Sequence, residues 1–389
     1  MGAAASDLPP LAVYVHVPWC VRKCPYCDFN SHAQVGELPE AAWLARLADD
    51  LADDLDEAPE LARRTVDSIF FGGGTPSLLS PATLGGALDL LHARLDVDRS
   101  AEITLEANPG TTEAARFRGF RSAGFNRLSI GVQSFSDRAL AALGRIHDAA
   151  DARRALAEAA AAGFGRINVD LMHGLPGQTH AEALADLEEG MQRGAGHLSW
   201  YQLTIEPNTE FFSRPPLLPL EDILGGIEDA GQAELETAGF ARYEVSAWAR
   251  PGEESRHNLN YWTFGDYLGL GPGAHGKISR TGSARPLAVL RSRRTRAPAD
   301  WLAKRTGPRA RRERIEATAL PGEFMLNALR LTNGVDEDLF EARTGLPLER
   351  VGPVIAALRE EGLLRPDRIA TTPMGLRFLD RVVGRFLDA

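Results

Sequence analysis

The chain has 389 residues, of which 44% are hydrophobic and 25% are charged, so its length and composition suit a globular protein with one large and one small domain. Its formal net charge of −10 argues against nucleic acid as the main partner. No run of about 18 apolar residues is present, and the N-terminus has no basic stretch before an apolar core, so we expect neither a transmembrane helix nor a secretory signal.

Strand-like and helix-like segments alternate through the first half of the chain. Short apolar runs predict strands at 12–17, 67–73, 102–108, 127–133, 167–174 and 198–206. Between them, apolar residues at spacings of three and four predict helices at 41–55, 81–95, 112–124, 151–163 and 180–194. This alternation predicts βαβ units around a parallel sheet. The six units are too few for a complete eight-stranded barrel.

All three cysteines of the chain lie in one short segment, HVPWCVRKCPYCDFNSH, and they are Cys20, Cys24 and Cys27. An odd, clustered set of thiols does not make a disulfide framework, so metal binding is favoured over three unconnected thiols. Tetrahedral zinc would need a fourth ligand, which His16 or His32 could supply. An iron–sulfur cluster of the [4Fe–4S] type usually takes four cysteines, so three leave one iron open to a substrate or cofactor. The segment favours the cluster over zinc.

Polar residues stand where several predicted strands end. The glycine-rich run FFGGGTP, residues 70–76, ends the second strand and lets backbone approach a ligand closely. Glu106, Gln133 and Asp170 end the third, fourth and fifth strands. In parallel βα architectures the chemistry sits at these carboxyl ends, so the residues predict one shared pocket together with the cysteine segment.

The rest of the chain divides into two parts after a first domain at 1–245. We expect a linking segment at 246–315, in which residues 280–314 are strongly basic and carry only Asp300 and Glu313 as acidic residues. That stretch predicts either a solvated face or a surface that attracts anions.

A small separate domain is predicted at 316–389. Helical patterns at 321–331, 335–345 and 347–364 precede a short wing-like stretch at 365–375 and a last helix. This is a winged-helix outline, and its nearly balanced charges lack the footprint of a DNA-binding domain. We expect it to help cover the mouth of the barrel.

The cysteine pattern C-x-x-x-C-x-x-C, with Tyr26 just before its last cysteine, resembles the radical S-adenosylmethionine (SAM) superfamily. The resemblance implies a partial (β/α)6 barrel. It also implies a [4Fe–4S] cluster on the three cysteines and SAM chelated to the open iron. In such proteins the cofactor carries the radical chemistry, and the protein positions and shields it.

Several further motifs in order, GGGTP, LEANP, GVQSF, LGRIH and VDLMHGLPGQT, narrow this resemblance to one family. That family contains the oxygen-independent coproporphyrinogen III oxidases and the haem chaperones of the HemW type. It implies that Tyr14 lies beside the sulfonium, that Arg145 pairs with the methionyl carboxylate, and that Tyr26 leans on the adenine. The family also implies contacts with the methionyl amine from Gly73, Gly74, Thr75 and Glu106. It implies contacts with the ribose hydroxyls from Gln133 and Asp170.

Two features favour the chaperone branch over the oxidases. Phe29 stands where the oxidases carry a further cysteine, and HNLNYW, residues 257–262, resembles the H-N-x-x-Y-W motif of that branch. An imidazole can ligate haem iron and large aromatics can flank a porphyrin, so His257, Tyr261 and Trp262 are predicted haem contacts near the barrel mouth. A packing cluster is the alternative. His275 is a weaker second candidate, and the basic stretch would meet the haem propionates.

The resemblance thus implies a cytoplasmic haem chaperone that binds haem and delivers it to haem proteins, with no assigned catalytic residue. Its implied partners are haem, an electron donor and haem-accepting proteins such as respiratory enzymes. The acceptors include membrane-associated proteins. Radical decarboxylation of coproporphyrinogen III and a radical reaction on another substrate remain as alternatives.

Overall fold

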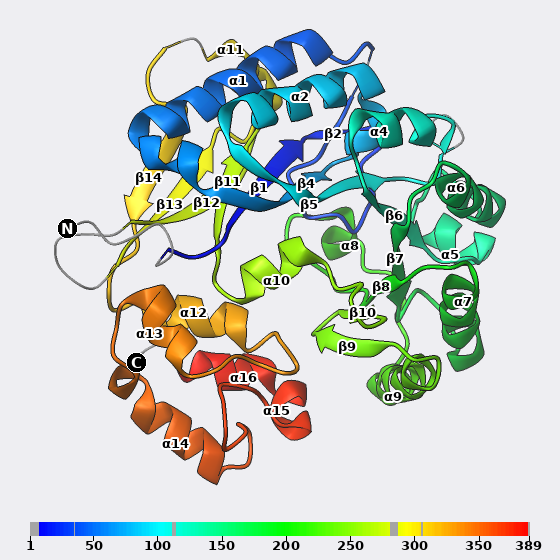
Figure 1. Cartoon of the computed structure of the whole chain (residues 1–389). Helices are drawn as coiled ribbons and strands as arrows, with labels where there is room; N and C mark the ends of the chain where they lie inside the picture. The colour runs from blue at the N-terminus through cyan, green and yellow to red at the C-terminus, as the bar shows by residue number, and fades with distance from the viewer. Residues whose placement is uncertain (1–7, 35, 111–113, 281–286, 305, 388–389) are drawn as a thin grey trace.

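The computed structural model describes residues 8–34, 36–110, 114–280, 287–304 and 306–387, and its centre is one large β-sheet (Figure 1). All six predicted strands are present, in chain order and mutually parallel: β1 (Leu11–Val17), β4 (Thr65–Gly73), β5 (Asp96–Ala107), β6 (Arg127–Gln133), β7 (Arg166–His173) and β8 (His197–Gln202). The prediction of six consecutive strand–helix units is confirmed.

The sheet extends beyond these six strands at both edges. One edge gains β11 (Asp266–Leu270), β12 (His275–Arg280), β13 (Ala288–Arg294) and β14 (Ala310–Arg314), and the other gains β10 (Ala247–Ala249) and β9 (Ala241–Glu244). β11 pairs with β1 in parallel, whereas the other additions are antiparallel. Residues 246–315, which we expected to be a linker, therefore contribute strands to the barrel sheet, and the domain boundaries stay a prediction.

Helices cover the outer side of the parallel strands (Figure 1). They are α1 (Glu40–Glu57), α2 (Pro81–Arg94), α4 (Phe117–Ala123), α5 (Asp137–Ala142), α6 (Ala149–Ala161), α7 (His180–Gln192) and α9 (Glu221–Thr237), with the short α8 (Glu210–Ser213) and α11 (Pro298–Ala303). α4 starts later than predicted, and residues 111–113 lie outside the described part of the chain.

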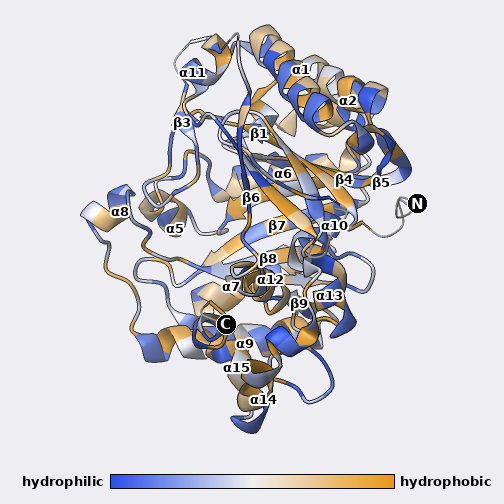
Figure 2. Ribbon diagram, turned by 90° about the vertical axis from the view of Figure 1, so that its left-hand side faces the viewer, coloured by the Kyte–Doolittle hydropathy of each residue, from blue (hydrophilic) through white to orange (hydrophobic). Residues whose placement is uncertain are grey.

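The local sequence explains why these helices form and which face they bury. α1 buries Trp43, Leu47 and Leu51, which recur every fourth residue along one face. α7 begins at a capping box in which the Thr179 side chain and the Glu182 side chain each satisfy a free backbone N–H. Apolar residues accordingly gather in the central strands and on the inward sides of the helices (Figure 2). Along the strands buried apolar residues alternate with buried polar ones, as Leu128 and Ile130 do with Ser129 in β6.

The C-terminal unit shares an apolar core with edge strands of the barrel sheet, and Tyr243, Ala247 and Val289 contribute to that core. It contains α12 (Leu320–Ala328), α13 (Asp338–Thr344), α14 (Gly352–Glu360), α15 (Pro373–Arg377) and α16 (Leu379–Gly384). Isolated antiparallel bridges, Val335 with Ile369 and Leu364 with Thr371, lie around the position predicted for the wing.

The expectation that this unit helps to cover the barrel mouth stays a prediction. The unit contacts the edge of the sheet, where Arg330 forms an ion pair with Glu244 of β9 at 3.4 Å. It packs against α10 (Arg256–Trp262) and the loop that follows it, where the ring of Phe264 meets that of Phe324 edge-on at 5.8 Å and Arg330 stacks on Trp262 at 4.4 Å. α10 lies at the amino-terminal end of the barrel strands, because its first backbone N–H, on Arg256, donates to Glu102 in β5 at 2.9 Å. The C-terminal unit lies beside this end (Figure 1).

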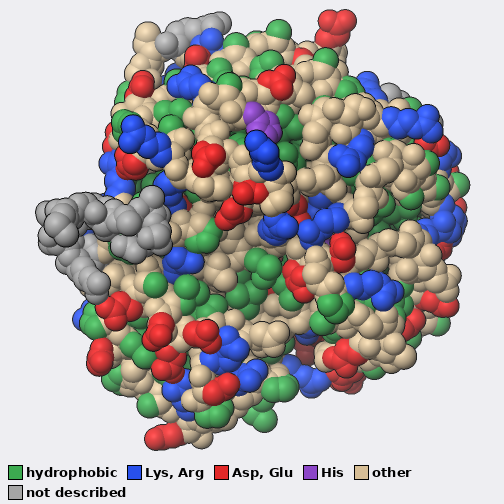
Figure 3. Space-filling model, viewed as in Figure 1, with side chains coloured by type: hydrophobic (Ala, Val, Ile, Leu, Met, Phe, Trp, Pro, Cys, Tyr) green, Lys and Arg blue, Asp and Glu red, His purple; other side chains and the backbone are tan. Residues whose placement is uncertain are grey.

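The face of the molecule seen in Figure 3 mixes acidic and basic side chains, with small apolar areas between them. None of the helices in the described part of the chain is both long enough and apolar enough to cross a membrane.

Candidate cofactor site

A cavity of about 330 Å³ opens at the carboxyl ends of the parallel strands. It brings together residues predicted from the cysteine segment, the glycine-rich run, three further strands and the loop after α5: Cys20, Cys24, Tyr26, Cys27, Gly73, Gly74, Thr75, Glu106, Gln133, Arg145 and Asp170. Asp170 was expected to end its strand, but it lies in the middle of β7 and reaches the cavity from there. Tyr14 does not line it, but its hydroxyl hydrogen-bonds the Nδ1 atom of His16 at 3.0 Å. The prediction of one shared pocket at the strand ends therefore agrees with the geometry.

The three cysteines lie on a loop folded against the cavity. A turn closes between them, because the Cys27 N–H donates to the Cys24 carbonyl at 3.1 Å. All three thiols are free and half-buried. Burial raises the pKa of the Cys20 thiol, and the Thr75 hydroxyl, 3.5 Å away, opposes that shift.

His16 takes no part in this thiol set, because its Nε2 atom bonds the Asn30 carbonyl at 3.0 Å while Nδ1 meets Tyr14. His32 bonds the Asn30 side chain at 3.2 Å. Among the described residues, no three His, Cys, Asp or Glu side chains are grouped so that they could hold a single metal ion.

The glycine-rich run leaves no room for side chains. Gly73 has φ +113, and a Cβ atom there would lie 2.3 Å from the His16 ring. Its N–H instead donates to the Glu106 carboxyl at 3.0 Å. A residue other than glycine would clash and be strained at this position, so the sequence GGG is required by the close packing of the loop.

Arg145 places a cation in the cavity wall. Its Nη2 atom donates to Asn108 at 2.6 Å and to the Gly131 carbonyl at 2.9 Å, and Nη1 lies 3.4 Å from the Cys24 sulfur. Its Nε atom is buried and has no hydrogen-bond partner among the described residues. A buried guanidinium with an unused donor suits a carboxylate ligand.

Two carboxyl groups lie deeper in the cavity. Burial, and then the proximity of Asp170, raise the pKa of Glu106 to about 8. Burial likewise raises the pKa of Asp170, against hydrogen bonds that include one from Asn168 at 2.8 Å. An ammonium group bound beside Glu106 would offset both causes of its shift. Three free thiols, a cation with an unused donor and two buried carboxyls thus fit a cluster and a zwitterionic cofactor.

Gln133 holds a backbone conformation that non-glycine residues rarely adopt, with φ 69. Its side-chain oxygen accepts a hydrogen bond from the Tyr201 hydroxyl at 2.8 Å, which fixes the amide at the cavity wall. Such local strain is commonly kept at functional sites.

Among the residues of this wall that were not predicted from the sequence are Asn108 and Tyr201. Asn108 bridges Arg145 and Thr75, donating to the Thr75 hydroxyl at 2.8 Å. Its position two residues after Glu106, on the same face of an extended segment, was a signal that could have found it. Tyr201 lies near the end of the sixth strand, as Glu106 does in the third.

The helix α10 carries HNLNYW at the end of the barrel opposite the cysteine loop, not at the mouth as we expected. His257 is 5% exposed, and its ring stacks on Phe70 at 4.9 Å and on Tyr14 at 6.1 Å. Tyr261 stacks on Tyr267 at 4.1 Å. Burial, and then Arg127, lower the pKa of His257 to about 3, so its imidazole is neutral.

The barrel, the three-thiol loop and the cavity define a radical SAM protein. The Radical SAM superfamily matches residues 14–189, and the HemN C-terminal domain matches residues 315–378. The superfamily implies a [4Fe–4S] cluster and SAM. Among solved structures, coproporphyrinogen III oxidase (HemN) from Escherichia coli, a radical SAM enzyme, aligns over 98% of this chain and 91% of its own with a TM-score of 0.80. At 23% identity that likeness shows the fold.

Curated relatives match along the whole chain. Heme chaperone HemW of Escherichia coli (strain K12) is 47% identical over 98% of this chain and 99% of its own length. Heme chaperone HemW of Mycobacterium tuberculosis (strain H37Rv) is 38% identical over 99% of this chain and 97% of its own. The chain therefore belongs to the heme chaperone HemW family.

Proposed function

We propose that this protein binds haem and delivers it to haem proteins. The observation that carries the proposal is the full-length similarity to proteins named heme chaperone HemW, at 47%, 44% and 38% identity. Phe29 supports it, since this exposed aromatic lines the cavity at the position where the oxidases are expected to carry another cysteine.

The same proposal assigns the cavity to a [4Fe–4S] cluster on Cys20, Cys24 and Cys27 with SAM at the fourth iron. When bound, the cluster supplies an electron to the sulfonium of SAM. Arg145 would hold the methionyl carboxylate, for which its unused Nε donor is available. Glu106 and the backbone of the glycine-rich run would hold the methionyl amine.

Further positions complete the cradle. Gln133 and Asp170 would bond the ribose hydroxyls, and Tyr26 would pack on the adenine. Tyr26 already contacts Phe211 at 6.3 Å between ring centres, which holds it on the cavity wall. The contact expected between Tyr14 and the sulfonium stays a separate prediction, because Tyr14 does not line the cavity.

The haem contact predicted for His257, Tyr261 and Trp262 stays a separate prediction. His257 is buried in the amino-terminal end of the barrel, so ligation of haem iron there requires α10 to move. We infer a cytoplasmic protein with haem proteins such as respiratory enzymes as acceptors, membrane-associated ones included, and with an electron donor for the cluster.

Titration of the anaerobically reconstituted protein with haem tests the proposal. We expect saturable binding at about one haem per chain with a defined Soret band, as for a specific haem site. Absorbance that rises linearly without saturation would contradict it.

The alternative function is radical decarboxylation of coproporphyrinogen III, which the fold shared with HemN favours. Anaerobic incubation with SAM, reductant and coproporphyrinogen III tests it by product analysis. We expect no multiple-turnover formation of protoporphyrinogen; many turnovers per chain would establish the oxidase instead.

A further inference from the structure

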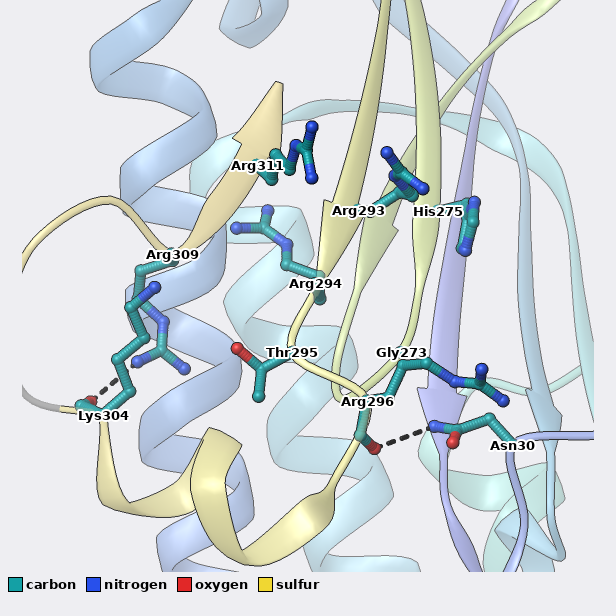
Figure 4. A pocket seen from close by; sticks show the side chains of 10 residues that line it. All are labelled: Asn30, Gly273, His275, Arg293, Arg294, Thr295, Arg296, Lys304, Arg309 and Arg311. Carbon is teal, nitrogen blue, oxygen red and sulfur yellow. Dashed lines mark hydrogen bonds between the residues drawn. The ribbon is translucent and has the colours of Figure 1, made fainter. Parts of the chain in front are cut away.

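A second cavity, of about 640 Å³, opens where the edge strands β12–β14 meet the cysteine loop (Figure 4). We call it the basic cavity, and its lining residues are Asn30, Gly273, His275, Arg293, Arg294, Thr295, Arg296, Lys304, Arg309 and Arg311. None of these ten described residues carries a carboxylate. The cavity is therefore walled by cations in a protein whose formal net charge is −10.

Basic side chains of three strands stand side by side across the sheet, and the like charges among them are the two arginines. His275 of β12 is the register partner of Arg293 in β13, and Arg293 is the register partner of Arg311 in β14. Like charges directly opposite each other destabilise a strand pair. Glu313 offsets Arg293 through an ion pair at 3.1 Å, but its side chain is 43% exposed and the bond is weak. An anion bound between these strands would relieve the remaining repulsion.

Two of the lining arginines already form ion pairs with carboxylates of the helix α1. Arg294 donates to Asp54 at 2.5 Å, and Arg309 donates to Asp50 at 2.5 Å, so both are held by carboxylates of α1. Their role is structural, although the Nη2 atom of Arg309 is buried and has no partner among the described residues.

Three other cations of the lining have no such carboxylate. Within the described part of the chain, Arg296, Lys304 and Arg311 form no ion pair, and Arg296 and Arg311 are exposed. These three groups, with the free donor of Arg309, are available to a ligand with more than one negative charge.

The basic cavity is joined to the cysteine loop. The Asn30 side-chain amide donates to the carbonyls of Pro272 and Arg296, both at 3.0 Å (Figure 4). Its neighbour Phe29 is 61% exposed and lines the cofactor cavity. Consecutive residues thus present an open aromatic ring on one side and a cationic cavity on the other. A flat apolar ligand with carboxylates along one edge matches this pair of surfaces.

We propose that the basic cavity holds the propionates of haem, beside the open imidazole of His275. The inference rests on the proposed haem-binding function and gives that function a location. Burial, followed by Arg293 and other nearby cations, lowers the pKa of His275, so its imidazole is neutral near pH 7 and can ligate iron. Unlike His257, it is reached from solvent without moving a helix.

The test compares haem affinity, by Soret titration, between the wild type and the double variant Arg296→Ala/Arg311→Ala. Both side chains are exposed, so their loss leaves the fold in place, which the cluster content and the unfolding transition check. We expect the double variant to bind haem roughly tenfold more weakly, because two exposed charge contacts are lost. Added salt should lower its affinity much less than it lowers that of the wild type. Arg311→Lys should keep most of the affinity, and Arg118→Ala, an exposed arginine on α4, should change nothing.

Haem dimethyl ester, in which both propionates are esterified, completes the test. The wild type should bind the ester more weakly than haem, and the double variant should bind the ester as the wild type does, since the lost cations no longer have a partner. A double variant that binds haem with wild-type affinity overturns the inference while the proposed function stands. A wild type that fails to bind haem overturns the proposed function, and the inference with it.

Discussion

The cofactor cavity and the helix α10 lie at opposite ends of the same barrel, and sequence patterns pointed to a ligand at both. At the carboxyl end, residues from the cysteine loop and four strands line one cavity, with the free Nε donor of Arg145 among them. At the amino-terminal end, His257 of HNLNYW is packed against Phe70 and Tyr14.

The difference shows which sequence patterns predict where a site lies and which predict only what kind of ligand it could bind. Strand ends fix a location, because parallel strands deliver their carboxyl ends to one face. Residue types suited to a ligand, such as an imidazole with two aromatics, fix no location, because the same side chains also make a packed core. The following experiments test the two ends in turn.

Replacing a cysteine should abolish the metal centre altogether. In Cys24→Ala only two thiolates remain, and we expect iron and sulfide to fall from about four of each per chain to near zero after anaerobic reconstitution. Val21→Ala, an exposed position in the same loop, should keep the full content. Zinc bound to the wild type without sulfide would contradict the assignment of a cluster.

At the opposite end, His257→Ala should act on stability. The substitution removes a ring that is 5% exposed, and we expect the free energy of unfolding to fall by about 2–4 kcal/mol, in the range of other large-to-small core changes. Chemical denaturation measures the loss. Arg256→Ala, on the exposed side of the same helix, should cost about 0.5 kcal/mol or less, and an equal loss in both variants would contradict specific packing of His257.

Haem titration of His257→Phe separates packing from ligation at the same position. Phenylalanine keeps an aromatic ring but cannot ligate iron, so the packed position predicts an affinity within about twofold of the wild type and an unmoved Soret band. His275→Ala is the matched comparison and should shift that band. A shift in His257→Phe alone would establish the haem contact predicted from HNLNYW.

Arg145→Ala should weaken SAM binding about ten- to a hundredfold, because a lost charge-assisted bond costs roughly 1.5–3 kcal/mol. Isothermal titration of the reconstituted protein measures the dissociation constant. Arg22→Ala provides the control, since Arg22 lines the same cavity but donates to the Gly144 carbonyl. Equal dissociation constants in Arg145→Ala and the wild type would show that this guanidinium does not meet the cofactor.

The cofactor end should also show a pH dependence of stability in the absence of SAM. The folded-state pKa of Glu106 is about 8, above its ordinary value of 4.5, so the folded protein keeps the proton between these values. Its contribution is complete below pH 4.5 and is lost as the pH rises to about 8. Glu106→Gln keeps an acceptor for the Gly73 N–H and removes the titration.

We therefore expect the wild type to lose on the order of 3 kcal/mol relative to Glu106→Gln between pH 5 and 8, because the folded protein keeps the proton over most of this range and one pKa unit corresponds to about 1.4 kcal/mol. Denaturation curves across that range measure the difference. The pKa of Asp170 is also raised, but Asp170 is present in both proteins and its effect cancels in the comparison. If the stabilities of the two proteins changed equally with pH, Glu106 would be ionised in the folded protein, which would contradict the raised pKa.

Much of the fold follows from the sequence because its signals are local. The six central strands are apolar runs between amphipathic helices, and their order fixed the cavity. β11 was not predicted, because its sequence, DYLGL, runs into the glycine-rich GPGAHG and suggests a loop. Its strand conformation comes from pairing with β1, where Tyr14 lies opposite Gly269. That contact joins residues far apart in the chain, and a local pattern does not show it.

The candidate site shows the same division. The cysteine spacing and the strand-end residues could be predicted, since each carries its own signal. The hydrogen bonds that link Asn108 to Arg145 and to Thr75 could not be predicted, because they depend on how far each side chain extends into the cavity. The basic cavity could not be predicted from the sequence, which shows only a basic stretch. The register of β12, β13 and β14 determines which of its cations lie together, and contacts with α1 determine which are already paired.

Transfer of haem from the loaded protein to an apo-haem protein such as apomyoglobin tests the central claim most directly. The proposed function predicts that the reconstituted chain, loaded with one haem, converts the acceptor to its holo form faster than an equal amount of free haem does. The Soret band of the acceptor follows the transfer. Haem that stays on the chain, or that reaches the acceptor no faster than free haem, would contradict a delivery function.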